Sequence, residues 1–308
     1  MHLIIDNVAV LFILVFLGYF LGKREVLPNR CTPDLSSFLI KVTLPATIFC
    51  SMIRPFQKSL MLDSFYLFIL MFVFHLLCLL LGLILVKIGR ISSQQAGTWL
   101  LVCMFSNNGF MGFPLAQSIY GNDGLFLMAV ANVVSNFLIF SLGIKLQTHG
   151  QATGHIGGRQ LFYNDINIAV IIGLLFYLLS WRPPEIIMTV LKDVSSLTAP
   201  LSMIVVGLSM SRSNIRKIFA NKKIYLLAFT RLLLIPILTI GILKVSPLGL
   251  HGLLPHLLIL ISALPSLSAV SMIAETYHTD TETPAQAIFI TTLFSPVTIP
   301  LIMLLAGK

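Results

Sequence analysis

Apolar stretches long enough to cross a bilayer recur along almost the whole of this 308-residue chain. A membrane-spanning helix needs about 20 mostly apolar residues. Only 10% of the residues are charged, whereas soluble domains carry about 25%. We therefore predict an all-α polytopic membrane protein without a separate soluble domain. The ten predicted transmembrane helices cover roughly residues 3–21, 34–53, 62–86, 95–119, 124–146, 165–181, 186–211, 222–244, 252–277 and 284–306.

Lysine and arginine residues are unevenly divided between the two sides of these helices. With the N-terminus outside, twelve of them fall in connectors that face the cytoplasm. Five fall on the other side, namely Arg54, Lys58, Arg182, Lys244 and Lys308. Because basic residues gather on the cytoplasmic side, we expect both termini outside a plasma membrane. The net charge of +9 then reflects orientation in the bilayer and not nucleic-acid binding.

The aspartates indicate an internal repeat. Six of the seven pair at nearly one interval: Asp6 with Asp165 (159 residues), Asp34 with Asp193 (159) and Asp123 with Asp280 (157). We predict two five-helix halves, 1–147 and 165–308, joined by a polar cytoplasmic connector at 148–164. Because five is odd, the second half enters the membrane from the opposite side. Inverted repeats are typical of secondary transporters, which bind substrate near the bilayer midplane.

A polar segment interrupts the fourth predicted helix. Ser106–Pro114 holds two amides, two glycines and a proline among apolar residues. Lipid cannot satisfy a broken backbone, so irregular chain at this depth faces protein or a watery cavity. The repeat interval places its counterpart at Pro265, within Ile261–Ser268 of the ninth helix. We expect the two interrupted helices to cross near the membrane centre, where half-helix N-termini suit an anion.

The same two segments carry a family resemblance. The run Asn107–Leu115 is similar to the pattern of an asparagine followed by Met-Gly-x-Pro-Leu in the auxin efflux carrier family. Leu264-Pro265 and the downstream Ala274–Tyr277 also resemble that family. It includes the plant PIN-type carriers and bacterial malonate and malate permeases, and the likeness covers essentially the whole chain. PIN-type carriers have a proline where this chain has Ser106.

The resemblance implies a fold and a mechanism. It implies ten helices in an inverted 5+5 repeat with helices 4 and 9 crossed, as in bile-acid symporters and sodium–proton antiporters. Helices 1, 2, 6 and 7 would form a scaffold. Helices 3–5 and 8–10 would form a transport domain that carries substrate by elevator-type alternating access. Asn107 matches the family's substrate-binding asparagine, and Pro265 matches its crossover proline.

The candidate site residues follow from the breaks and from charge within spans. The substrate-binding candidates are Asn107, Asn108, Ser106, Gly109, Pro265, Ser262 and Ser266. Gly112 and Pro114 would shape the crossover, although glycines and prolines also serve simple helix packing. Buried amides can equally join helices together, and serines can bond back to the preceding turn.

Charged and ionisable residues inside spans supply further candidates, because they are costly in a membrane. Lys41, His75 and Glu275 could each serve as a coupling group or as the charge partner of an anion. Lys41 could instead reach an interface, His75 could be a neutral, hydrogen-bonded core residue, and Glu275 could be an acid at the membrane interface. We expect Arg231 to form an ion pair or to reach the membrane surface.

The leading functional hypothesis is a secondary transporter of a small organic anion, such as malonate, malate or an auxin-like acid. An anion channel or a non-transporting membrane receptor is the alternative. An enzyme is not expected, since no His-Glu-x-x-His, Gly-x-Ser-x-Gly or P-loop pattern occurs. We expect no cofactor and no metal site. Coupling to H⁺ or Na⁺ and assembly as a homodimer both stay open.

Overall fold

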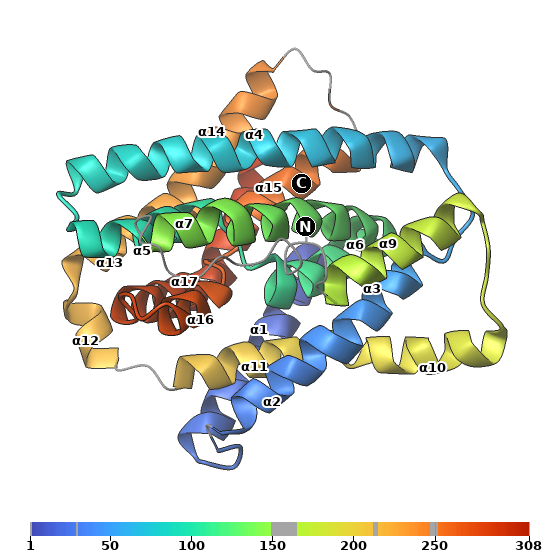
Figure 1. Ribbon diagram of the computed structural model, residues 1–308, viewed down its shortest axis with the longest axis horizontal. Helices are drawn as coiled ribbons and strands as arrows, with labels where there is room; N and C mark the ends of the chain where they lie inside the picture. Colours follow the sequence, from blue (N-terminus) through green and yellow to red (C-terminus); the bar gives the residue numbers. More distant parts are fainter. Residues whose placement is uncertain are drawn as a thin grey trace.

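The computed structural model describes residues 2–28, 30–148, 165–211, 215–246, 250 and 252–307. The predicted connector at 148–164 therefore lies outside the described residues, apart from Thr148. Throughout the described ranges the chain is helical, as the composition predicts, and extended pairing is limited to one isolated antiparallel bridge between Ser106 and Ser266. Figure 1 shows the helices packed together in several orientations.

The helices of the first half begin with α1 and end with α7. Their bounds are α1 His2–Lys23, α2 Cys31–Phe38, α3 Leu44–Met52, α4 Lys58–Ile88, α5 Ser93–Met104, α6 Phe113–Leu138 and α7 Ile144–Gln147. Three short π-helical segments interrupt this series, namely η1 Leu39–Thr43, η2 Asn108–Gly112 and η3 Ile139–Gly143.

The helices described from residue 165 onward begin with α9 and end with α17. Their bounds are α9 Asp165–Leu178, α10 Glu185–Ser196, α11 Thr198–Ser211, α12 Ile215–Ala220, α13 Lys222–Phe229, α14 Ile235–Val245, α15 Leu253–Ala263, α16 Ala269–Thr276 and α17 Glu282–Leu305. One π-helical segment, η4 Thr230–Leu234, lies between α13 and α14.

Seven helical stretches in the described ranges are long and apolar enough to cross a membrane. They are Asp6–Lys23, Cys31–Met52, Lys58–Ile88, Asn108–Gln147, Glu185–Ser211, Lys222–Val245 and Glu282–Leu305. Two shorter apolar helices, Asp165–Leu178 and Leu253–Ala263, accompany them. The protein is therefore a multi-pass membrane protein. The full count of ten spans stays a prediction.

The two shorter helices fall in the sixth and ninth predicted spans, and the remaining difference from ten has a local cause at the fourth and fifth. The break at Ser106 cuts α5 off from η2 and α6, and α5 alone is too short to cross a membrane. The chain beyond the break continues as one apolar run, Asn108–Gln147. Within it Gly121 has φ 65° and ψ −151°, a conformation open to glycine but strained for other residues. The chain turns there, between the two predicted spans.

Proline explains three of the four π-helical segments. Pro45, Pro114 and Pro236 each occupy the second position of the helix that comes directly after η1, η2 and η4. Proline has no N–H to bond the carbonyl four residues earlier, and its ring crowds that carbonyl. The helix widens by one residue ahead of it, and such π-bulges are frequent at functional sites. The sequence thus places irregular turns at Lys41, Gly109 and Arg231.

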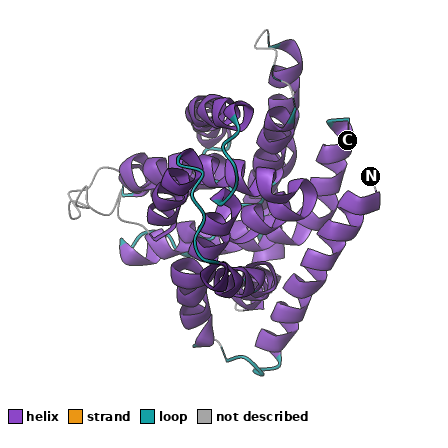
Figure 2. Cartoon of the chain, turned by 90° about the vertical axis from the view of Figure 1, so that its right-hand side faces the viewer, coloured by secondary structure: helices purple, strands orange, loops and turns teal. Residues whose placement is uncertain are grey.

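Glycine brings α1 and α11 into close contact. A Cβ atom at Gly207 would lie 2.0 Å from the Val15 carbonyl oxygen, and one at Gly18 would lie 2.3 Å from that of Ile204. Small residues let membrane helices approach this closely. The beginning of α1 also lies near the end of α17, as Figure 1 and Figure 2 both show. Which side of the membrane holds these ends stays a prediction.

Large apolar side chains cover the outside of the molecule. On α4, the long helix along the upper edge of Figure 1, Phe65, Leu76, Leu80 and Ile84 are all at least half exposed. A soluble protein rarely exposes so large an apolar surface, whereas lipid solvates it well. The buried polar residues include Ser106, Asn107, Asn108 and Ser266 at the two helix breaks.

Candidate functional site

The two predicted breaks meet and satisfy each other's backbone. The chain leaves α5 at Met104 and α15 at Ala263, and the next residue of each break, Phe105 and Leu264, is extended. The Asn107 N–H donates to the Pro265 carbonyl (2.9 Å), and the Leu267 N–H donates to the Phe105 carbonyl (3.1 Å). These bonds supply the partners that lipid cannot offer. We call the segments 105–109 and 264–268 together the junction.

Ser106 connects the junction to Arg231. Its Oγ donates to the Ile261 carbonyl (2.8 Å) and accepts a hydrogen bond from Arg231 Nη2. The same Nη2 also donates to the Ile261 carbonyl at 3.3 Å. Arg231 is 0% exposed. The prediction that it reaches the membrane surface or forms an ion pair is therefore wrong, because η4 turns it inward onto the junction.

The positive charge of Arg231 has no negative partner. All eleven acidic residues fall within the described ranges, and no ion pair joins any of them to Arg231. Its Nε and Nη1 atoms are buried without a hydrogen-bond partner among the described residues. Burying an unpaired charge costs several kcal/mol, and it is tolerated in membrane proteins mainly where function requires it. The guanidinium is therefore a buried positive charge with two of its nitrogen atoms unpartnered in the described part of the chain.

Asn107 organises the beginning of the half-helix after the first break. Its Oδ1 accepts from the Phe110 N–H (3.2 Å), and its carbonyl accepts from the N–H groups of Met111 and Gly112. Its Nδ2 donates to Ser268 Oγ at 3.1 Å, across to the second break. Asn107 is 1% exposed. It thus ties the start of η2 to the start of α16.

Asn108 points in a different direction, toward α6 and α4. Its Nδ2 donates to Ser135 Oγ (3.1 Å), and Ser135 Oγ lies 3.3 Å from His75 Nε2. His75 Nδ1 bonds to the Met71 carbonyl at 2.7 Å. Oδ1 of Asn108 is buried without a partner in the described part of the chain. The structure therefore brings His75 to the junction, although 30 or more residues separate it from both breaks in the sequence.

The serines of the second break have separate partners. Ser266 receives support from α17: its N–H donates to Thr291 Oγ1 (3.2 Å), and the two hydroxyls lie 3.1 Å apart. Ser262 instead donates back to the Ile259 carbonyl at 2.7 Å. It thus shows the local bonding that sequence reasoning offered as its alternative. Thr291 was missed because a threonine within an apolar helix carries no distinguishing signal.

Other predicted residues differ in their distance from this site. Gly109 has nothing within 4 Å of the place where a Cβ would stand, whereas a Cβ at Gly112 would lie 3.0 Å from Leu264 Cδ1. Pro114 begins α6. Lys41 and Glu275 are exposed, and within the described ranges neither bonds to a junction residue. Their suggested role as coupling or charge partners is untested.

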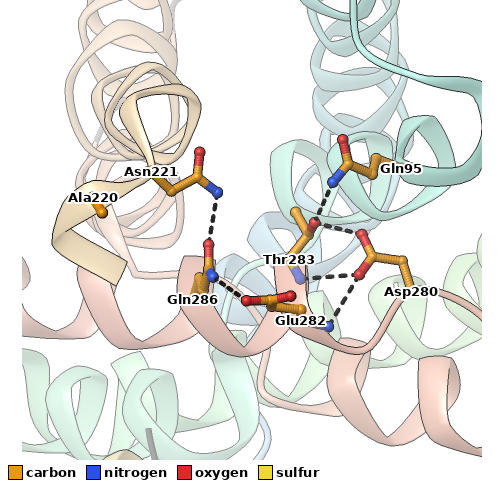
Figure 3. A pocket seen from close by; sticks show the side chains of 7 residues that line it. All are labelled: Gln95, Ala220, Asn221, Asp280, Glu282, Thr283 and Gln286. Carbon is orange, nitrogen blue, oxygen red and sulfur yellow. Dashed lines mark hydrogen bonds between the residues drawn. The ribbon is translucent and has the colours of Figure 1, made fainter. Parts of the chain in front are cut away.

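A separate polar pocket of about 350 Å³ opens where α5, α13 and α17 begin. Figure 3 shows Asn221 donating to Gln286 (2.7 Å) and Gln95 donating to Thr283 (3.3 Å), while Asp280 accepts from the first N–H groups of α17. Its lining residues are Gln95, Ala220, Asn221, Asp280, Glu282, Thr283 and Gln286. None of these residues belongs to the junction, so the pocket is a separate site at the helix ends.

Comparison with known proteins identifies the family. A family profile described as "Membrane transport protein" matches residues 3–157 and 149–303. An uncharacterized transporter of Methanothermobacter thermautotrophicus is 28% identical over 305 residues, and another, MJ1031 of Methanocaldococcus jannaschii, is 26% identical over 304. Each alignment covers 96% of both chains.

A third relative has a more specific name. The protein described as a putative malonate transporter of Rhizobium meliloti is 23% identical over 297 residues, covering 93% of this chain and 90% of its own. The profile spans nearly the entire sequence, and the family resemblance of the two breaks is thereby confirmed. The chain belongs to the membrane transport protein family, which is the auxin efflux carrier family.

Proposed function

We propose that the protein is a secondary transporter of a small organic anion and that the anion binds at the junction. Family membership establishes transport as the general activity. The observation that carries the proposal is Arg231, a guanidinium that is fully buried beside both breaks without an acidic partner. A carboxylate matches it in charge and in geometry, since guanidinium forms paired hydrogen bonds to carboxylate oxygens.

The surrounding groups favour the same ligand. The first turn of η2 comes directly after Asn107, and the N-terminal end of a helix carries partial positive charge. Gly109 leaves open space at that turn. No carboxylate of the protein bonds to the junction in the described ranges. Candidate substrates are malonate, malate and auxin-like acids, and the name of the Rhizobium meliloti relative supports testing malonate first.

The proposed mechanism is elevator-type alternating access. Two interrupted helices that bond to each other hold the ligand between them, so a movement of α4–α7 with α13–α17 would carry the whole site. The other predicted group, α1–α3 with α9–α11, contains the tight contact between Gly207 and Val15, as expected for a rigid scaffold. Binding at the repeat interface and opening to alternate sides is a common design of secondary transporters.

The test uses purified protein in liposomes with radiolabelled malonate outside. The wild type should show saturable uptake and should exchange internal for external malonate. Arg231→Gln removes the charge and should reduce uptake at least about tenfold, since a hydrogen bond to a charged group contributes about 1.5–3 kcal/mol. Arg231→Lys keeps the charge without the planar fork, so it should retain an intermediate rate.

Arg182→Gln is the matched control, because Arg182 is exposed between α9 and α10. It should transport like the wild type. Unchanged uptake by Arg231→Gln would refute the assignment of the binding site. Conduction that rises without saturation would favour the anion channel, and malonate binding without any flux would favour a receptor.

A further inference from the structure

A chain of hydrogen bonds leads from the junction to a buried histidine. It runs from Asn108 Nδ2 to Ser135 Oγ (3.1 Å) and from Ser135 Oγ to His75 Nε2 (3.3 Å). His75 is 2% exposed, Asn108 is 1% exposed and Ser135 is 6% exposed. The imidazole also packs against the ring of Phe105, the residue before Ser106, with ring centroids 5.2 Å apart. The proposed anion site and this histidine are thus close neighbours.

The partners of His75 determine where its proton lies. The Met71 carbonyl at 2.7 Å can only accept, so Nδ1 carries the hydrogen of the neutral ring. Nε2 is then free to accept from the Ser135 hydroxyl. That hydroxyl has a second acceptor, the Ala131 carbonyl at 3.2 Å. It can therefore donate to either of two groups.

A proton added to Nε2 is accommodated without any movement of heavy atoms. Nε2–H would donate to Ser135 Oγ, and the hydroxyl hydrogen would turn from Nε2 to the Ala131 carbonyl. The Asn108 amide would donate to the same Oγ in both states. In the protonated state the bonds from Asn108 and from Nε2–H together fill the two acceptor positions of Ser135 Oγ. His75 therefore has complete hydrogen bonding in both protonation states, and the gain or loss of a proton at Nε2 is accompanied only by rotation of the Ser135 hydroxyl.

His75 and the proposed anion both interact electrostatically with Arg231. Arg231 is the charged group that acts on His75, and the buried thiols Cys78 and Cys103 interact with Arg231. No ion pair with a carboxylate is found for His75 in the described ranges. In an empty site the Arg231 charge opposes a second positive charge nearby. A bound anion neutralises Arg231, so a proton on His75 becomes more favourable. By linkage, the proton strengthens anion binding to the same degree.

We propose that His75 is the proton-binding site of the transporter, taking up one proton with each anion and releasing it when the anion leaves. This inference rests on the proposed function. It identifies H⁺ as the coupling ion and makes the transporter a proton–anion symporter. Asn108 and Ser135 act as positioning residues that connect the proton site to the junction.

The experiment measures proton and anion movement in the same liposomes. A trapped pH-sensitive dye reports protons, and radiolabelled malonate reports the anion, with protein-free liposomes correcting for leakage of the undissociated acid. In the wild type an inward malonate gradient should carry protons inward at a constant ratio of about one per malonate. An imposed inward proton gradient should drive malonate accumulation, and a sodium gradient should not.

Variants then assign the proton to His75. His75→Gln keeps a hydrogen-bonding group near Ser135 but cannot titrate, so the proton-to-malonate ratio should fall close to zero, whatever exchange rate remains. Ser135→Ala provides a second variant and should shift the pH at which uptake is half-maximal. His278→Asn is the control, because His278 is exposed in the connector before α17 and its positive φ suits asparagine.

The outcomes separate the two proposals. Malonate flux without proton flux, sodium-driven accumulation, or an unchanged ratio in His75→Gln would each overturn the proton site while leaving the anion transporter intact. A loss of coupling in His278→Asn would also overturn it. The absence of saturable flux for every carboxylate in the wild type would overturn the proposed function, and the proton site with it.

Discussion

Arg231 donates a hydrogen bond from Nη2 to the hydroxyl oxygen of Ser106. The two residues are 125 positions apart, one in a π-helical turn and the other in a helix break. A residue without a side-chain oxygen at position 106 could not accept this bond. Ser106 thus has a structural role in this chain, because its hydroxyl holds the buried cation beside the junction.

Replacing Arg231 by methionine should raise the stability of the ligand-free protein. Methionine fills a similar volume without a charge, and replacing buried charged groups by apolar ones of similar size often stabilises by about 1–4 kcal/mol. The expected result is a higher Tm in detergent together with loss of malonate transport. A lower Tm of the ligand-free Arg231→Met variant would contradict this expectation, since it would show that burying Arg231 stabilises the folded protein.

Carboxylates should stabilise the wild type and leave Arg231→Met unchanged. A ligand that binds only the folded state stabilises it by about 2.7 kcal/mol at one hundred times its Kd. A thermal-shift titration with malonate, malate and an aromatic acid should therefore raise Tm with the logarithm of concentration. Neutral sugars serve as the control. Equal stabilisation of both proteins would mean that the acids bind elsewhere.

Asn107→Ala should abolish saturable malonate uptake while the protein still folds. The change removes the cap on the Phe110 N–H and the bond to Ser268, so the two half-helices lose their side-chain connection. Loss of an N-cap costs about 1 kcal/mol, too little to unfold a domain of ordinary stability. Size-exclusion chromatography checks folding. Asn122→Ala, in the exposed turn after Gly121, should transport normally, and normal transport by Asn107→Ala would contradict the site.

Two glycine substitutions should separate close packing from helix propensity. Gly207→Ala places a Cβ 2.0 Å from the backbone oxygen of Val15, so α1 and α11 must move apart. We expect a clear fall in Tm and in the yield of monodisperse protein. Gly241→Ala meets nothing within 4 Å and should be neutral or stabilise by about 0.5–1 kcal/mol. Similar Tm values for the two variants would contradict the packing of α1 against α11.

The location of the helix breaks could be predicted because their cause is local. Polar and glycine residues at 106–112 and a proline at 265 cannot continue an apolar helix in lipid. The aspartate spacing then predicted that the two breaks correspond to each other. In the structure they are in contact, since the Asn107 N–H donates to the Pro265 carbonyl. The division into spans was less secure, since the turn at Gly121 occurs inside a continuous apolar run.

Arg231, His75 and Thr291 show what local patterns cannot reveal. A charged residue within a span has the same sequence signal whether it reaches the membrane surface, forms an ion pair or turns inward without one, and sequence reasoning predicted one of the first two for Arg231. Only the π-helical turn ahead of Pro236, together with the packing of η4 against α15, directs it to Ser106. His75 reaches Asn108 through Ser135, which lies on a third helix.

The sequence by itself determined that this chain is helical, membrane-embedded and interrupted at two matching places. Those properties depend on hydropathy and on backbone chemistry, which each segment carries independently. The tertiary structure decided which side chains meet at the breaks. The role of a buried charge depends on which partners the packing places beside it. All eleven acids of the chain lie in the described ranges and none pairs with Arg231, a fact that only the packing of the helices could decide.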